Sequence, residues 1–238
     1  MGTCGPPPGL HVLPREWYDR DSLKVAPDLL NKVLASGDGR RGRIVEVEAY
    51  RGPDDPGSHA FRGPTKRNAT MWGPPGHLYV YFVYGMHWCA NVVCGPPGVA
   101  HAVLVRAVAA EAGLEVMRAA RWGGDPARRR PRPDRDLCRG PARLCQAFAI
   151  TGADDGTDLV AAGGTIAPAA SRAQAPVVPG TPVVTIGDDG VGPPASPLVT
   201  TRVGLSAGAD LPWRFAVPDH RGVSRWMGAP RRGRARLR

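Results

Sequence analysis

Residues 43–50 read R-I-V-E-V-E-A-Y, and this stretch is the strongest indication of the fold. The side chains of a β-strand alternate between its two faces, so Glu46, Glu48 and Tyr50 share one face. The two valines and the alanine between them share the other face, which suits a hydrophobic core. The stretch therefore predicts a strand that presents carboxylates and an aromatic ring on one surface.

The residues that follow this strand, G-P-D-D-P-G-S-H at 52–59, contain too many glycines and prolines to extend it. They predict a loop that folds His59 back toward Glu48. Glu48, Tyr50 and His59 then form a candidate site. The alternative is a half-exposed strand whose glutamates are solvated and have no further role.

Other segments predict a sheet around this strand. Residues 78–94 are rich in β-branched and aromatic residues on both sides of Gly85, which indicates a hairpin. Residues 99–108 predict a further strand, and residues 152–200 carry turn signals between short apolar runs.

Helices are predicted where apolar residues lie three or four positions apart, at 28–34, 111–121 and 142–150. An arginine-dense segment at 126–135 contains too many prolines for a helix. We interpret it as a solvated insertion, with a mobile phosphate contact as the alternative.

Composition indicates one main domain with a basic character. We expect a flexible segment at 1–16, one domain at 17–228 and a basic disordered tail at 229–238. The chain has 31 basic and 21 acidic residues, a net charge of +10, and only three lysines. A GC-rich genome explains part of the arginine content but not the net charge, which favours a nucleic acid partner.

The five cysteines are odd in number and form no C-x-x-C pair, which argues against a disulfide framework and a structural zinc site. This cysteine usage favours a reducing cytoplasm. The sequence shows no export signal and no run of apolar residues long enough to span a membrane. We therefore expect a cytoplasmic protein without a membrane partner.

Tyr84 precedes Gly85 at the predicted hairpin turn, where an aromatic ring is hard to bury. Proteins that act on a base within duplex DNA extrude it, insert a side chain into the stack and hold the base between rings. Tyr84 is a candidate for the inserted side chain, and Tyr50, His59 and Tyr81 are candidates for the rings. Taken singly, each tyrosine is more simply explained as a core or edge residue.

Six motifs together carry a family resemblance: G-R-I-V-E-V-E-A-Y at 42–50, S-H at 58–59, R-N at 67–68, G-H-L-Y-V-Y-F-V-Y-G-M-H-W-C-A-N at 76–91, L-V-R-A at 104–107 and G-P-A-R-L-C-Q-A at 140–147. Through them the sequence resembles the alkyladenine (3-methyladenine) DNA glycosylase family. The resemblance extends from about residue 20 to the R-F-A-V segment at 214–217.

The resemblance implies a mixed α/β (α+β) fold, with a single domain around a curved antiparallel β-sheet, flanking helices and a protruding β-hairpin. It implies a monomer that needs no metal or organic cofactor and acts on double-stranded DNA at the bacterial nucleoid. The implied activity is excision of alkylated purines such as 3-methyladenine and 7-methylguanine. Hypoxanthine and ethenoadenine are further implied substrates.

Two residues match the catalytic positions of the family. Glu48 matches the general base that activates water against the anomeric carbon, and Arg106 matches an arginine near that water and the phosphate. The chemistry suits a carboxylate, because cleavage of a glycosidic bond builds positive charge on the sugar. The remaining matches are the base pocket (Tyr50, His59, Tyr81, Asn91), the intercalating Tyr84, and the backbone contacts Arg67 and Asn68.

Lysine content bears on the reaction independently of the resemblance. A glycosylase that also cuts the strand needs an amine, usually of lysine, to form a Schiff base. No lysine follows Lys66, whose neighbours Arg67 and Asn68 suggest a phosphate contact instead. We therefore predict a monofunctional enzyme. The family segment T-P-R-N reads T-K-R-N at 65–68, and the arginine-dense segment is an addition to the family pattern, so the substrate range stays open.

Two other functions compete with this one. The first is a metal-dependent nuclease that binds magnesium or manganese through its acidic residues and one histidine (Glu46, Glu48, Asp54, Asp55, His59). The second is a non-catalytic binder of damaged DNA that uses Tyr84 as a wedge and arginines on phosphates.

Overall fold

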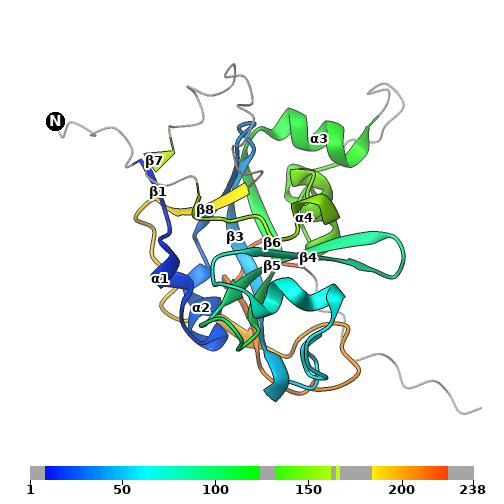
Figure 1. Ribbon diagram of the computed structural model, residues 1–238. Helices are drawn as coiled ribbons and strands as arrows, with labels where there is room; N and C mark the ends of the chain where they lie inside the picture. The colour runs from blue at the N-terminus through cyan, green and yellow to red at the C-terminus, as the bar shows by residue number, and fades with distance from the viewer. Residues whose placement is uncertain (1–8, 124–131, 162–164, 167–183, 225–238) are drawn as a thin grey trace, which may run out of the picture.

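A single antiparallel sheet, with ten strands among the described residues, organises the protein (Figure 1). The computed structural model describes residues 9–123, 132–161, 165–166 and 184–224. From one edge the strands follow the order β4 (Leu78–Val83), β5 (His87–Cys94), β6 (His101–Ala112), β3 (Arg41–Arg51), β2 (Val33–Ser36), β8 (Val184–Asp188), β1 (Leu10–Val12) and β7 (Thr165–Ile166). Two short strands, β9 (Leu198–Thr200) and β10 (Arg214–Ala216), continue from β3 through the pairing of β10. The expected α+β fold around an antiparallel sheet is confirmed.

Strand β3 is central to this sheet because it has neighbours on both edges. It pairs with β6 from Arg41 to Arg51, and on its other edge with β2 and then with β10. The β3–β6 register shifts near Ile44 and Glu46, as at β-bulges, which bend and twist a strand. The carboxylate face of β3 is buried as well as the valine face, with Glu46 and Glu48 at 0% exposure. The alternative of solvated glutamates is therefore wrong.

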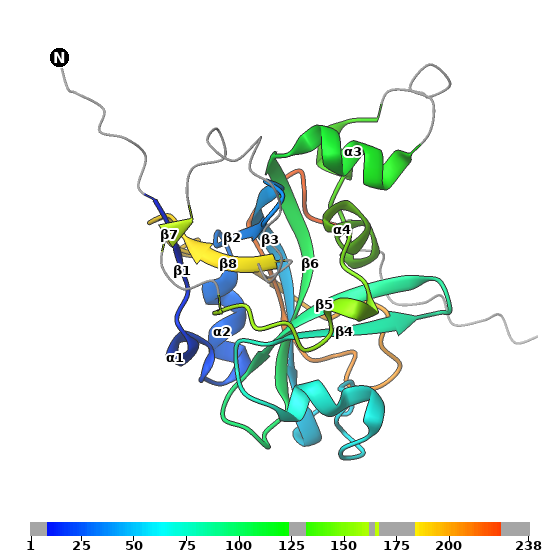
Figure 2. The same cartoon turned by 45° about the horizontal axis from the view of Figure 1, so that its top comes forward.

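In the part of the chain that the structure describes, four helices flank the sheet: α1 (Arg15–Tyr18), α2 (Ser22–Leu29), α3 (Leu114–Trp122) and α4 (Pro141–Phe148). Short 3₁₀ segments are η1 (Gly52–Asp54), η2 (Lys66–Trp72), η4 (Asp134–Asp136) and η5 (Gly152–Asp154). The helices expected at 111–121 and 142–150 are confirmed as α3 and α4, which lie side by side in both views (Figure 2).

The helix expected at 28–34 is displaced toward the N-terminus. Asp21 caps α2 by accepting a hydrogen bond from the backbone of Leu23, and Asn31 has a φ of 67° that stops any continuation. Residues 33–36 instead form β2 between β3 and β8. The same apolar pairs suit a buried strand as well as a helix face, which is why the pattern misled.

The structured region also begins earlier than expected. Strand β1 pairs with β7 and β8, so residues 10–12 belong to the sheet and the predicted flexible segment at 1–16 is too long. Residues 1–8, the predicted tail at 229–238 and positions 126–131 of the arginine-dense segment lie outside the described residues. Within the described part of the chain, none of the helices is long and apolar enough to cross a membrane.

The hairpin predicted around Gly85 is confirmed, and it projects from the sheet (Figures 1 and 2). Tyr84 and Gly85 both have positive φ angles, 53° and 67°, in the three-residue turn that connects Val83 to its partner His87. Glycine adopts this conformation freely, but a bulky residue rarely does. Tyr84 is 78% exposed, so its packing does little to offset the strain.

We expect Tyr84→Asn to raise the free energy of unfolding by about 0.5–1 kcal/mol, because asparagine tolerates the left-handed conformation better than tyrosine. Urea denaturation would show this as a higher midpoint with an unchanged slope. The matched control is Met86→Asn, since Met86 is 64% exposed in the same hairpin and does not have a positive φ. Equal effects of the two substitutions would contradict strain at Tyr84.

Candidate functional site

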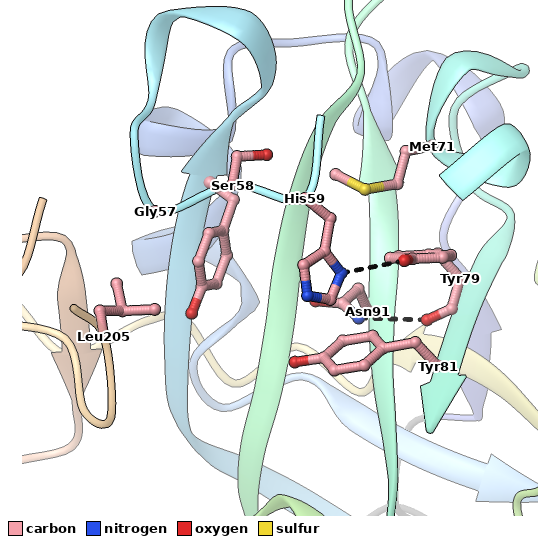
Figure 3. A pocket seen from close by; sticks show the side chains of 9 residues that line it. Gly57, Ser58, His59, Met71, Tyr79, Tyr81, Asn91 and Leu205 are labelled. Atoms are coloured by element: carbon pink, nitrogen blue, oxygen red, sulfur yellow. Dashed lines mark hydrogen bonds between the residues drawn. The ribbon is translucent and has the colours of Figure 1, made fainter. Parts of the chain in front are cut away.

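A small pocket of about 50 Å³ lies where the carboxylate face of β3 meets the hairpin strands β4 and β5 (Figure 3). Four predicted base-pocket residues line it together: Tyr50, His59, Tyr81 and Asn91. The sequence had not assigned the other lining residues to the site, namely Gly57, Ser58, Met71, Tyr79 and Leu205. The rings of three tyrosines and a histidine therefore surround one hollow.

His59 reaches the pocket on the loop after β3, as predicted. Its Nδ1 lies 3.0 Å from the hydroxyl oxygen of Tyr79, and its ring meets Tyr81 edge-on with centroids 4.4 Å apart (Figure 3). Burial against these neighbours, and then the positive charge of Arg67, lower the pKa of His59. The imidazole is therefore neutral at pH 7.

The hairpin strands supply the polar groups on the other side of the pocket. Asn91 is 3% exposed, and its side-chain amide donates to the carbonyl of Tyr79 at 3.1 Å. Burial raises the pKa of Tyr79 to about 12 and that of Tyr81 further. Both phenols stay protonated at neutral pH, so this wall of the pocket carries no charge of its own.

Glu48 lies next to the pocket, fully buried, and three donors fix its carboxylate. Oε1 is 3.0 Å from a guanidinium nitrogen of Arg106 and accepts the backbone N–H of Val203 at 2.8 Å. Oε2 accepts the hydroxyl of Tyr50 at 3.0 Å. Burial and then the charge of Glu48 raise the pKa of Tyr50, which keeps this phenol a donor. The structure thus joins the predicted base directly to a pocket ring.

Glu46 lies on the same face of β3, but its carboxylate holds neighbouring segments of the fold together. Its Oε1 accepts from Arg106 at 2.8 Å and from Arg214 at 2.7 Å, and Ser224 donates to both of its oxygens. Burial acts to raise the pKa of Glu46, but the two guanidinium groups and Ser224 outweigh it and hold the pKa below its usual value. Arg106 therefore links Glu46 to Glu48 and orients the latter.

Arg202 and Asp55 form a second buried pair that sequence reasoning missed. Two guanidinium nitrogens of Arg202 lie 2.5 and 2.7 Å from the two carboxylate oxygens of Asp55, and both side chains are 0% exposed. The Arg202 guanidinium also lies 4.6 Å from the ring centroid of Tyr50. The two residues are 147 positions apart in the sequence, and the fold of the chain brings them together.

The predicted DNA contacts fall into three different environments. Tyr84 lies at the exposed hairpin tip, outside the pocket lining. Arg67 is exposed and donates to the carbonyl of Phe82 at 2.9 Å, so it braces the hairpin. Asn68 is 2% exposed, and its side chain bonds to Thr65 and to the carbonyls of His59 and Gly63. Its amide therefore shapes the His59 loop, and its predicted phosphate contact stays a prediction.

The acidic residues of the nuclease alternative do not form a ligand set. Glu46 and Asp55 are paired with arginines, and the described residues contain no group of three or more His, Cys, Asp or Glu side chains placed to hold a metal ion. Carboxylates already neutralised by guanidinium groups are poor ligands for a divalent cation. The donor chemistry of the site therefore gives the nuclease alternative no support.

Comparison with known proteins agrees with this geometry. The family model for methylpurine-DNA glycosylase (MPG) matches residues 16–221. A protein of Burkholderia cenocepacia, named "Putative 3-methyladenine DNA glycosylase", is 54% identical over 222 residues, which is 93% of this chain and 95% of the relative. Relatives of the same name from Carboxydothermus hydrogenoformans and Streptomyces avermitilis are each 44% identical and cover 90% and 93% of this chain and 99% and 95% of their own lengths, respectively. The chain belongs to the methylpurine-DNA glycosylase family.

Proposed function

We propose that this protein is a monofunctional DNA glycosylase that extrudes a damaged purine from duplex DNA, hydrolyses its N-glycosidic bond and leaves an abasic site. The observation that carries the proposal is the position of Glu48. Its carboxylate is fixed by three donors and is 3.0 Å from the hydroxyl of a ring that lines the aromatic pocket.

Glu48 would act as the general base. Departure of the purine builds positive charge on the sugar, and a carboxylate both stabilises that charge and takes a proton from the attacking water. Oε1 already accepts from Arg106 and Val203, whereas Oε2 accepts only the Tyr50 hydroxyl among the described residues and keeps a lone pair for the water. Arg106 would hold the carboxylate in place.

The pocket would select the base. Alkylated purines such as 3-methyladenine and 7-methylguanine are cationic in the nucleotide, and electron-rich rings beside a neutral His59 attract a cation. Asn91 lies against the pocket with a fixed amide and would screen bases by their exocyclic groups. The proposal extends to the neutral lesions hypoxanthine and ethenoadenine, whose departure needs more help from the enzyme.

The surface would hold the duplex. Tyr84, exposed at the tip of the hairpin, is suited to fill the gap that the extruded base leaves in the stack. Arg67 lies beside the same hairpin and would contact the backbone. We propose that the protein acts as a monomer on double-stranded DNA in the cytoplasm, where a bacterial chromosome lies.

We expect Glu48→Gln to slow single-turnover release of free base by roughly a hundredfold or more, because a positioned general base contributes about 10²–10⁴. The substrates are methylated DNA and a duplex with one hypoxanthine, both in EDTA. Glu16→Gln is the control, since Glu16 is exposed on α1. Binding without base release by the wild type would instead leave a lesion-binding protein, and loss of release in EDTA would favour the metal-dependent alternative.

We expect the purified enzyme to leave the abasic strand uncut without alkali, and Lys66→Ala to behave like the wild type. Lys66 is exposed at the start of η2, and no lysine lines the pocket. Denaturing gels run with and without alkali measure this. Strand scission that persists without alkali and disappears in Lys66→Ala would disprove the monofunctional mechanism.

We expect Tyr84→Asn to lower base release from duplex DNA more than from single-stranded DNA carrying the same lesion, because only the duplex needs a wedge to keep the base extruded. The ratio of the two single-turnover rates measures the effect. Met86→Asn should leave this ratio unchanged. An equal loss on both substrates would argue that Tyr84 acts elsewhere in the reaction.

A further inference from the structure

Arg202 lies behind a ring of the base pocket. Its guanidinium carbon lies over two rings, 4.6 Å from the ring centroid of Tyr50 and 5.0 Å from that of Trp213. Tyr50 lines the pocket, whereas Arg202 does not and its side chain is 0% exposed. The cation therefore faces the surface of the Tyr50 ring that is turned away from the pocket.

The positive charge of Arg202 is balanced by the carboxylate of Asp55. Asp55 binds two guanidinium nitrogens of Arg202, and the carbonyls of Ala49 and Gly208 accept further hydrogen bonds at 3.0 and 3.1 Å. Gly57 leaves room for this arrangement, because a Cβ there would lie 2.8 Å from a nitrogen of Arg202. Neither charged group can turn toward water, so the pair acts on Tyr50 as a fixed dipole.

We propose that the Arg202–Asp55 pair is a specificity-determining positioning pair, which sets the preference of the pocket for cationic over neutral bases. The inference rests on the proposed glycosylase function. The face of an aromatic ring attracts cations through its quadrupole. A guanidinium on the back of the ring opposes that attraction, and the Asp55 carboxylate cancels most of the opposition.

The Arg202 and Asp55 charges are buried, so their effect on a base in the pocket is larger than it would be at the protein surface. Charges at buried positions are poorly screened by solvent and salt, so removal of one partner leaves a net charge close to the bound base. Loss of Asp55 would leave a positive charge behind Tyr50 and disfavour a cationic purine. Loss of Arg202 would leave a negative charge there and favour it.

The pair also positions two segments of the site. Asp55 precedes His59 in the loop after β3, and Arg202 precedes Val203, whose N–H holds Glu48, and Leu205, which lines the pocket. A purely structural role would therefore change the rates on all substrates together. The electrostatic role alone predicts opposite changes in selectivity for the two partners.

The experiment compares single-turnover release of 7-methylguanine, which is cationic in DNA, with release of hypoxanthine, which is neutral. The measured quantity is the ratio of the two rates. We expect Asp55→Asn to lower the ratio and Arg202→Gln to raise it, each by roughly threefold to thirtyfold. The double variant removes both charges and should return the ratio to near the wild-type value.

Arg202→Lys provides a test that leaves no lone buried charge. Lysine can keep an ion pair with Asp55 but withdraws the planar cation from the Tyr50 ring, so the ratio should rise by roughly twofold. Thermal melts confirm that each variant is folded. An unchanged ratio in folded variants, or a shift in the same direction for Asp55→Asn and Arg202→Gln, would overturn the inference. Failure of the wild type to release either base would instead disprove the proposed glycosylase function.

Discussion

The structure depends on a buried array of balanced charges. Three carboxylates and three guanidinium groups lie between β3, β6, β10 and the loops around them, and none of these residues is more than 7% exposed. A buried charge is tolerated only with a partner, so the array requires its members to be present together. The members are Glu46, Glu48, Asp55, Arg106, Arg202 and Arg214.

This array explains why strand β3 is buried on both faces. Valine side chains on one face of β3 pack into the core, while the glutamates on the other face bind arginines from β6 and β10. Removing one partner of a buried pair typically costs about 3–5 kcal/mol, because the other charge is left uncompensated. That cost keeps Glu48 in one orientation before any substrate arrives, and such preorganisation is what electrostatic catalysis requires.

Local patterns predicted the parts of the molecule that are set by neighbouring residues. The alternation at 43–50 and the Tyr84-Gly85 turn suffice to predict β3 and the hairpin, and the family motifs bring together Tyr50, His59, Tyr81 and Asn91. Three features depend on long-range contacts and were missed: the burial of Arg202 against Asp55, the role of Arg214, and the part of Leu205 in the pocket. A charged residue in a glycine-rich or proline-rich segment predicts a solvated loop, and nothing local indicates its distant partner.

The charges of the buried array balance one another, so attraction to DNA phosphates and the electrostatics around Glu48 depend on different residues. Equal numbers of buried carboxylates and guanidinium groups cancel, so the net charge of +10 must come from residues elsewhere in the chain. Attraction between exposed arginines and phosphate is long-range and weakens with salt. Interactions inside the array are short and shielded from ions, so salt that releases the duplex leaves the geometry around Glu48 unchanged. Affinity for DNA and chemistry at the base can therefore vary independently among substitutions, the first through surface arginines and the second through the buried pairs.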